Sequence, residues 1–179
     1  TFTKKFVEEM NKLVLGFPMA EPTNLGPLAS IKLRDQLHAQ VQESVKMGAK
    51  IELGGIIPPN SGAFYPPTVL SNVQPGMPAF NEELFGPVAA LIKAEDEVDA
   101  IMLANDTDYG LGAAIFSRDV EYAENIGKEL VEAGSVFINE AVQSDPRLPF
   151  GGIKMSGFGR ELSSYGIKEF CNIKTVYVA

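Results

Sequence analysis

Apolar residues recur at helical spacing in the first fifty positions of the chain. Residues 2–15 carry a stripe in which every fourth residue is apolar, and this pattern predicts a helix that Gly16 and Pro18 end. A second helix with one apolar face is predicted over residues 30–47. The apolar positions are Phe2, Phe6, Met10 and Val14 in the first helix and Leu33, Leu37, Val41 and Val45 in the second.

Two short extended segments follow these helices. The sequence "AKIELGG", residues 49–55, predicts a strand that Gly54 and Gly55 close. The sequence "YPPTVL", residues 65–70, predicts an extended edge strand, because two prolines cannot donate hydrogen bonds to a neighbour on each side.

From Val88 onward, strand patterns alternate with helix patterns. Strands are predicted over residues 88–94, 112–117 and 135–139, and helices over residues 95–105 and 119–133, with Gly134 as the cap that follows the second helix. This alternation predicts an α/β fold with parallel strands joined by crossover helices. The tail "CNIKTVYV", residues 171–178, alternates apolar and polar positions and predicts one more strand.

Composition and charge exclude several classes of protein. The chain has 179 residues, is 45% apolar, and carries a net charge of −8 that is spread along its length. Nucleic acids and anionic membranes both attract basic surfaces, so neither is an expected partner. The longest apolar runs are far shorter than the ~20 residues that a membrane-spanning helix needs.

Three candidate reactive groups fail on their sequence context. The only cysteine, Cys171, lies in a predicted strand without a cation or a helix start to lower its pKa, and a packing role is expected. The only histidine, His38, lies in a polar stretch of helix and is expected to be solvated; with so few soft ligands, no metal site is predicted. "GFGRE", residues 157–161, lacks the third glycine of a dinucleotide fingerprint. A single cysteine also fits a reducing compartment, and we expect a cytoplasmic protein.

The corner "EELFGP", residues 82–87, can bind a nucleotide. A carboxylate accepts hydrogen bonds from two adjacent ribose hydroxyls, and Phe85 can present its ring to a planar heterocycle. The alternative is a charged loop whose phenylalanine merely joins the core. The residues alone leave both interpretations open.

The glycine-rich segment "RLPFGGIKMSGFGRE", residues 147–161, is too long for a plain connector. Phe150 stands between Pro149 and Gly151, which places a bulky ring on a rigid mount. A binding loop and a packed surface loop anchored by Phe150 fit this pattern equally well.

Taken together, these segments resemble the C-terminal half of the NAD(P)-dependent aldehyde dehydrogenases, and most of all bacterial succinate-semialdehyde dehydrogenases. The resemblance rests on "EELFGP", "LANDTDYGLGAAIFSRD", "VEAGSVFIN" and "LPFGGIKMSGFGREL" in this order, and it covers essentially the whole chain. It implies that residues 1–165 form part of an α/β catalytic domain with a parallel sheet. It also implies that residues 166–179 are an oligomerisation segment, whose strand joins subunits into a homodimer or homotetramer.

The resemblance also assigns roles to residues that bind the cofactor, which is NAD or NADP. Glu83 would bind the nicotinamide ribose, Phe85 would lie against the nicotinamide, and Leu111 would be an apolar neighbour of the same ring. Phe150 would line the aldehyde tunnel.

The segment before Phe150 carries the expected substrate specificity. By the same resemblance, Val142 and Ser144 would face the tunnel, and Ser144 would bind the far carboxylate of succinate semialdehyde. Arg147 is a further candidate for that carboxylate, although a solvated arginine in a turn fits the residues as well. Simple aliphatic aldehydes are the alternative substrates.

One essential part of the family's chemistry is missing from this sequence. In the family a cysteine thiolate attacks the aldehyde, a thiohemiacetal transfers hydride to the cofactor, and water hydrolyses the thioester with help from a glutamate. That cysteine lies in a Gly-Gln-x-Cys motif, which this sequence does not contain. We therefore expect a piece of a longer enzyme with no catalytic residue and no activity by itself. A stand-alone binding or oligomerisation module is the alternative.

Overall fold

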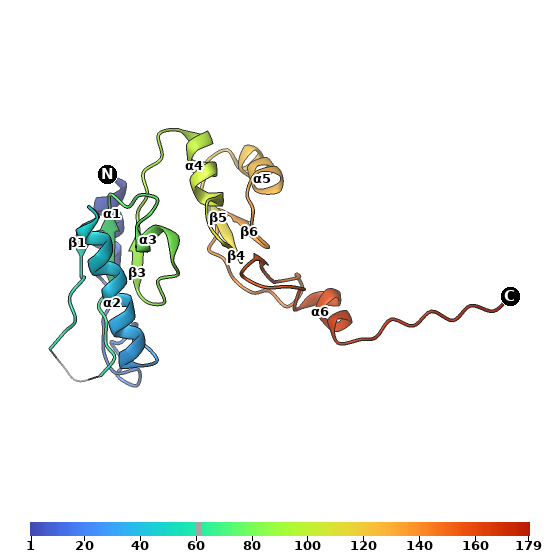
Figure 1. Cartoon of the computed structure of the whole chain (residues 1–179), viewed down its shortest axis with the longest axis horizontal. Coiled ribbons are helices and arrows are strands. Elements are labelled where there is room, and N and C mark those ends of the chain that lie inside the picture. Colours follow the sequence, from blue (N-terminus) through green and yellow to red (C-terminus); the bar gives the residue numbers. More distant parts are fainter. Residues whose placement is uncertain (60–61) are drawn as a thin grey trace. The chain divides into compact units, whose positions relative to one another are not determined.

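The computed structural model describes residues 1–59 and 62–179. The chain forms two compact units, residues 1–93 and residues 94–179 (Figure 1). Both units combine helices with short strands, as the α/β prediction requires.

The first unit contains a three-stranded sheet in the order β1-β2-β3, formed by Lys50–Leu53, Thr68–Ser71 and Val88–Ala90. Strands β1 and β2 are antiparallel, whereas β2 and β3 are parallel. The segment expected at a sheet edge is therefore the central strand. The prediction was wrong because Pro66 and Pro67 precede the paired residues, and the first amide after them, that of Thr68, bonds the Pro87 carbonyl at 2.9 Å.

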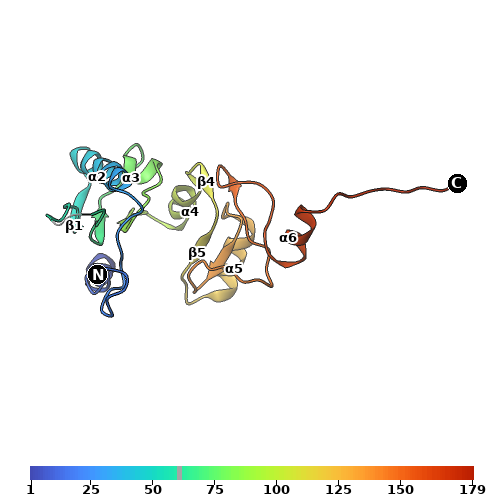
Figure 2. The ribbon, with the colours of Figure 1, turned by 90° about the horizontal axis from the view of Figure 1, so that it is seen from below.

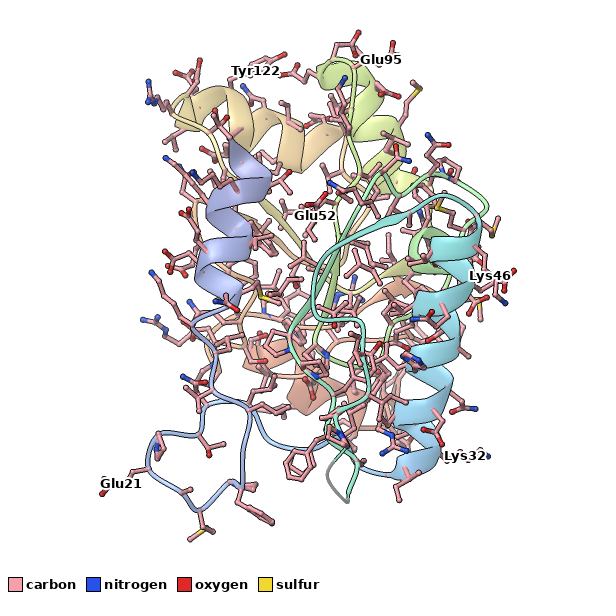
Figure 3. All side chains as sticks on the ribbon, turned by 90° about the vertical axis from the view of Figure 1, so that its left-hand side faces the viewer. Glu21, Lys32, Lys46, Glu52, Glu95 and Tyr122 are labelled. Atoms are coloured by element: carbon pink, nitrogen blue, oxygen red, sulfur yellow. The ribbon has the colours of Figure 1, made fainter. Side chains whose placement is uncertain are left out.

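Helix α2, Ile31–Lys46, covers this sheet and supplies much of its core. The Ser30 hydroxyl caps its first turn by accepting a hydrogen bond from the Leu33 amide. The predicted apolar face is confirmed, since Leu37 and Val41 are fully buried. Figure 3 shows Lys32 and Lys46 at opposite ends of α2, pointing away from the ribbon. The same core includes Ala79 of the short helix α3, Pro78–Asn81.

Helix α1, Phe2–Met10, is shorter than the predicted helix over residues 2–15. Pairing with a distant segment replaces its last turn: Leu15 bridges Leu25, and the Val14 carbonyl accepts hydrogen bonds from the amides of Asn24 and Leu25. Helical spacing of apolar residues cannot reveal such a competitor.

The second unit contains two pairs of strands. Strands β5, Ala113–Ile115, and β6, Val136–Ile138, are parallel and are joined by helix α5, Val120–Glu129, as predicted (Figure 2). Strands β4, Tyr109–Gly110, and β7, Ile153–Lys154, are antiparallel. Helix α4, Glu97–Asn105, precedes β4. Because β3 pairs with β2 and not with β5, α4 is not a crossover within one sheet.

Gly134 was expected to follow the end of the helix now seen as α5, but that helix ends at Glu129 with Leu130 as its cap. Gly134 instead passes against the backbone of Gly151, where an added Cβ would overlap the Gly151 carbonyl. Its lack of a side chain lets β6 approach the glycine-rich segment.

The last helix, α6, spans Ser163–Glu169, and the chain continues after it as an extended, exposed segment (Figure 1). The strand predicted for residues 171–178 does not form, because a strand needs a neighbouring backbone to bond and this segment has none among the described residues. None of the helices described for this chain is long and apolar enough to cross a membrane.

Candidate functional site

The corner at residues 82–87 is held from both sides. Helix α3 ends where Glu82 turns to extended geometry, and the Gly86 amide bonds the Leu84 carbonyl at 2.7 Å. A Cβ on Gly86 would overlap the side chain of Leu37, so the absence of a side chain lets the corner lie directly on α2. The corner therefore takes its shape from helix α2, which begins at Ile31, far earlier in the chain.

A single α2 side chain distinguishes the two carboxylates. Gln40 Nε2 donates to Glu82 Oε2 at 2.8 Å and to the Glu83 main-chain carbonyl at 3.3 Å. Within the part of the chain that the structure describes, the Glu83 carboxylate has no hydrogen-bond partner. Glu82 is thus engaged by protein, whereas Glu83 presents a free carboxylate.

The free carboxylate borders a cavity of about 400 Å³. Its lining residues are Leu33, Gln36, Leu37, Ala39, Gln40, Glu82, Glu83 and Phe85. The residue Phe85 is 64% exposed, so the alternative in which it merely joins the core is wrong. A carboxylate acceptor beside an exposed aromatic face suits the ribose and ring of a nucleotide. The contribution of Gln40 had no indication in the sequence, since it arises from packing across 42 residues.

Leu111 lies directly after β4 in the second unit and is 45% exposed. The next residue, Gly112, packs against Val142, where an added Cβ would lie 2.6 Å from Val142 Cγ1. The structure thus brings Val142, a predicted substrate contact, beside the backbone that carries Leu111, a predicted cofactor contact.

Phe150 is fixed by a hydrogen-bonded pair of backbones. Its amide bonds the Glu161 carbonyl at 2.9 Å, and the Glu161 amide bonds the Phe150 carbonyl at 2.8 Å. Arg160 Nη1 donates to the Gly152 and Gly159 carbonyls at 2.9 and 2.7 Å, which closes the loop between them. Phe150 lines a cavity of about 410 Å³ together with Phe137, Asp145, Leu148 and neighbouring residues. The glycine-rich segment is therefore an ordered mount for this ring.

Arg147 does not present a free charge. Its guanidinium bonds the Asp145 carboxylate through Nε–Oδ1 at 2.9 Å and Nη2–Oδ2 at 2.6 Å, and its amide bonds Oδ1 as well. These hydrogen bonds lower the pKa of Asp145 from 3.8 to about 2. Ser144, next to this pair, is exposed and leaves its hydroxyl accessible.

Lys154 connects the glycine-rich segment to the end of α4. Its Nζ donates to the carbonyls of Asn105 and Thr107 at 2.9 and 3.1 Å and forms a 2.7 Å ion pair with Glu132. The Gly110 amide bonds Ser156 Oγ at 2.9 Å and completes the link between β4 and this segment. Sequence reasoning did not identify Lys154, because nothing in its neighbourhood indicates which distant carbonyls it reaches.

Two of the three rejected groups, Cys171 and His38, have different surroundings from those expected. Cys171 is exposed, not packed, with its Sγ bonded to the Ile167 carbonyl at 3.3 Å. His38 is half-buried, not solvated: its Nδ1 lies 3.1 Å from the Tyr65 hydroxyl. Burial raises the pKa of Tyr65 to about 12, so this phenol stays neutral. Among the described residues, no cluster of His, Cys, Asp or Glu could hold a metal ion.

Comparison with known proteins identifies the family of this chain. Residues 1–176 match the aldehyde dehydrogenase family. The chain is 51% identical, over 176 residues, to the succinate semialdehyde dehydrogenase [NAD(P)+] Sad of Escherichia coli, covering 98% of this chain and 38% of that protein. It is 46% identical to succinate-semialdehyde dehydrogenase [NADP(+)] 1 of Mycobacterium ulcerans, with 99% and 38% covered.

Solved structures show the same relationship. The succinic semialdehyde dehydrogenase of Streptococcus pyogenes in complex with NADP+ superimposes with a TM-score of 0.93 at 37% identity, covering 99% of this chain and 39% of that one. The chain thus spans well under half the length of the relatives that it matches.

Proposed function

The chain belongs to the aldehyde dehydrogenase family, and on that premise we propose that it supplies the C-terminal portion of an enzyme that oxidises an aldehyde to a carboxylic acid with NAD or NADP. The observation that carries this proposal is the free Glu83 carboxylate beside the exposed Phe85 ring. The nucleophilic cysteine, which forms the thiohemiacetal and thioester, would lie in a part of the enzyme outside this chain.

Three residues of this chain would position the cofactor. The Glu83 carboxylate accepts hydrogen bonds from the two ribose hydroxyls, one at each oxygen, and Phe85 presents its ring face to the nicotinamide. Leu111 gives the same ring an apolar contact. When bound, the nicotinamide accepts hydride from the substrate. These residues contribute to the rate because they hold the nicotinamide within a fraction of an ångström of the productive position.

The proposed substrate is succinate semialdehyde. Phe150 and Val142 line the aldehyde tunnel with apolar surface, and the exposed Ser144 hydroxyl donates to the far carboxylate. Arg147 remains a second candidate for that carboxylate, and its hydrogen bonds to Asp145 also neutralise an acidic group that would otherwise repel an acidic substrate. Simple aliphatic aldehydes are the second candidate, favoured by the apolar residues Phe137, Leu148 and Phe150 around the cavity.

Location, assembly and domain division complete the proposal. Residues 1–165 belong to the catalytic domain and residues 166–179 to an oligomerisation segment, in a homodimer or homotetramer. The exposed apolar tail supports this division, since Ile173, Val176 and Tyr177 are each at least three-quarters exposed and an apolar segment of this kind needs a partner surface. A single cysteine supports a cytoplasmic location.

The cofactor assignment is tested with Glu83→Gln in the intact enzyme, followed by NAD(P)H absorbance with succinate semialdehyde. Misplacing the nicotinamide should lower the hydride-transfer rate on the order of 100-fold, with little change in cofactor affinity. Glu82→Gln is the matched control, and it should have the smaller effect. A larger loss of rate in Glu82→Gln would show that Glu82, and not Glu83, binds the ribose.

The substrate assignment is tested with Ser144→Ala, comparing kcat/KM for succinate semialdehyde and butanal. Losing one hydrogen bond to a charged group should cost about 1.5–3 kcal/mol for the acid and almost nothing for butanal. Equal losses, or a wild-type preference for butanal, would contradict the carboxylate assignment. Residues 1–179 alone should reduce neither NAD nor NADP with any aldehyde, as expected of a chain without the nucleophile.

A further inference from the structure

The α2 residue Gln40 is built into the support of the corner through both its side chain and its backbone. Its Nε2 reaches Glu82 Oε2 and the Glu83 carbonyl, as described above. Its own main-chain carbonyl accepts the Ser44 hydroxyl at 2.8 Å, and Ser44 Oγ accepts the Ala79 amide of α3 at 2.9 Å. Ser44 is fully buried, so this connection between α2 and α3 is shielded from water.

From this geometry we propose that Gln40 is a positioning residue, which determines which of two adjacent carboxylates serves the cofactor. Gln40 holds the Glu82 carboxylate against α2 and fixes the backbone of Glu83, so that the Glu83 carboxylate remains free to face the ribose. The inference rests on the proposed function and adds to it a residue that acts through Glu82 and the backbone of Glu83.

The chemistry of an amide suits this role better than a cation would. A neutral amide donates to one carboxylate without cancelling the charge of its neighbour, so Glu83 keeps its full strength as an acceptor. Glutamate in place of Gln40 would have no donor and would repel Glu82, and this repulsion would displace the corner. Since two adjacent carboxylates already repel each other, holding one in a fixed direction also determines where the other points.

The experiment compares four variants of the intact enzyme: Gln40→Ala, Gln40→Glu, the double exchange Gln40→Glu with Glu82→Gln, and Gln42→Glu. In the double exchange, the carboxylate is at position 40 and the amide is at position 82. An amide donor therefore again faces a carboxylate, but the two groups have exchanged places. Gln42 lies on the same helix but bonds the Gly55 carbonyl at 3.3 Å, so it controls for a new charge on α2. The readouts are the single-turnover rate of hydride transfer, the Kd for the cofactor and the thermal midpoint.

We expect Gln40→Glu to lower hydride transfer about 10- to 100-fold while the cofactor Kd changes only a few-fold, since misplacement acts on the reacting geometry. Gln40→Ala should lie between this variant and the wild type. The double exchange should recover part of the lost rate, because it restores the contact with residue 82 but not the donor to the Glu83 carbonyl. Gln42→Glu should behave as the wild type. Rescue by the double exchange is a result that general destabilisation of α2 could not produce.

Two outcomes would overturn the inference and can be told apart. If the wild type transfers hydride but Gln40→Glu is as fast, or the double exchange is as slow as Gln40→Glu, Gln40 does not position Glu83 and the proposed function stands. If the intact wild type reduces neither NAD nor NADP with any aldehyde, both the proposed function and this inference are wrong.

Discussion

Replacing Lys154 with methionine should loosen the segment that carries Leu111. Methionine keeps most of the side-chain length and apolar stem, but it removes the ammonium that bonds the Asn105 and Thr107 carbonyls and pairs with Glu132. Lys154 also has a φ of +53°, an unfavourable conformation for a residue with a side chain. Its three polar contacts are what stabilise this conformation in the native state.

The size of the effect follows from these contacts. A hydrogen bond to a charged group contributes ~1.5–3 kcal/mol when it is shielded from water. The Lys154 side chain is 26% exposed, and the lost carbonyl bonds can be partly replaced by water, so the low end applies. The ion pair with the exposed Glu132 adds at most ~1 kcal/mol. Together these terms give about 1.5–2.5 kcal/mol, or roughly 10- to 60-fold in a local opening equilibrium at ~1.4 kcal/mol per factor of ten.

Hydrogen exchange on the intact protein measures this opening directly. The reporting amides are those of Gly110, bonded to Ser156 Oγ, and Met155, bonded to the Asp108 carbonyl. Lys128→Met is the matched control, because Lys128 forms a 2.6 Å ion pair with Glu124 on the surface of α5 but bonds no main-chain carbonyl among the described residues. Equal exchange at Gly110 in the wild type and in Lys154→Met would refute the assigned role, and so would an equal acceleration by Lys128→Met.

Two further predictions concern the loop before Phe150 and the tail. Because the folded pKa of Asp145, about 2, lies below its ordinary 3.8, its pairing with Arg147 stabilises the loop fully above pH 3.8 and is lost as the pH falls toward 2. An NMR titration should place the Asp145 midpoint near 2 and move it back toward 3.8 in Arg147→Ala, and an unchanged midpoint would contradict the pairing. Deleting residues 172–179 from the intact enzyme should yield monomers or insoluble protein in size-exclusion chromatography, and a soluble oligomer of full size would argue against the oligomerisation segment.

Local patterns predicted most elements of the fold, and three of the misses share one cause. Helix α2 and the β5–α5–β6 crossover follow from spacing and capping residues alone. The end of α1, the central place of β2 and the absence of a strand in the tail depend on which backbone segments find a partner. Pairing between distant segments is not encoded in local spacing, so those three features could not be predicted from it.

The candidate site divides in the same way. The residue types at Glu83, Phe85 and Phe150 by themselves left a binding site and a packed loop both open, and the resemblance to the family selected these residues. The residues that hold these segments in place, Gln40, Arg160 and Lys154, could not be predicted. They bond main-chain carbonyls and carboxylates, which any polar residue could in principle reach. The charge of Arg147 shows the same limit: its sequence neighbour Asp145 was visible, but the bidentate bond that neutralises it was not.

At the corner, residues 82–87, the residue types alone do not determine the function, because a contact from a distant helix contributes as well. Glu82 and Glu83 are chemically identical and adjacent, so their residue type offers no reason for one to bind a ribose and the other not; only the resemblance to the family assigned Glu83. The difference arises from one amide on α2, 42 residues away from Glu82. Change at position 40 can therefore alter hydride transfer while the motif "EELFGP" stays intact. A search for altered activity in this family that considers only the motif residues would miss α2, where the choice between the two carboxylates is made.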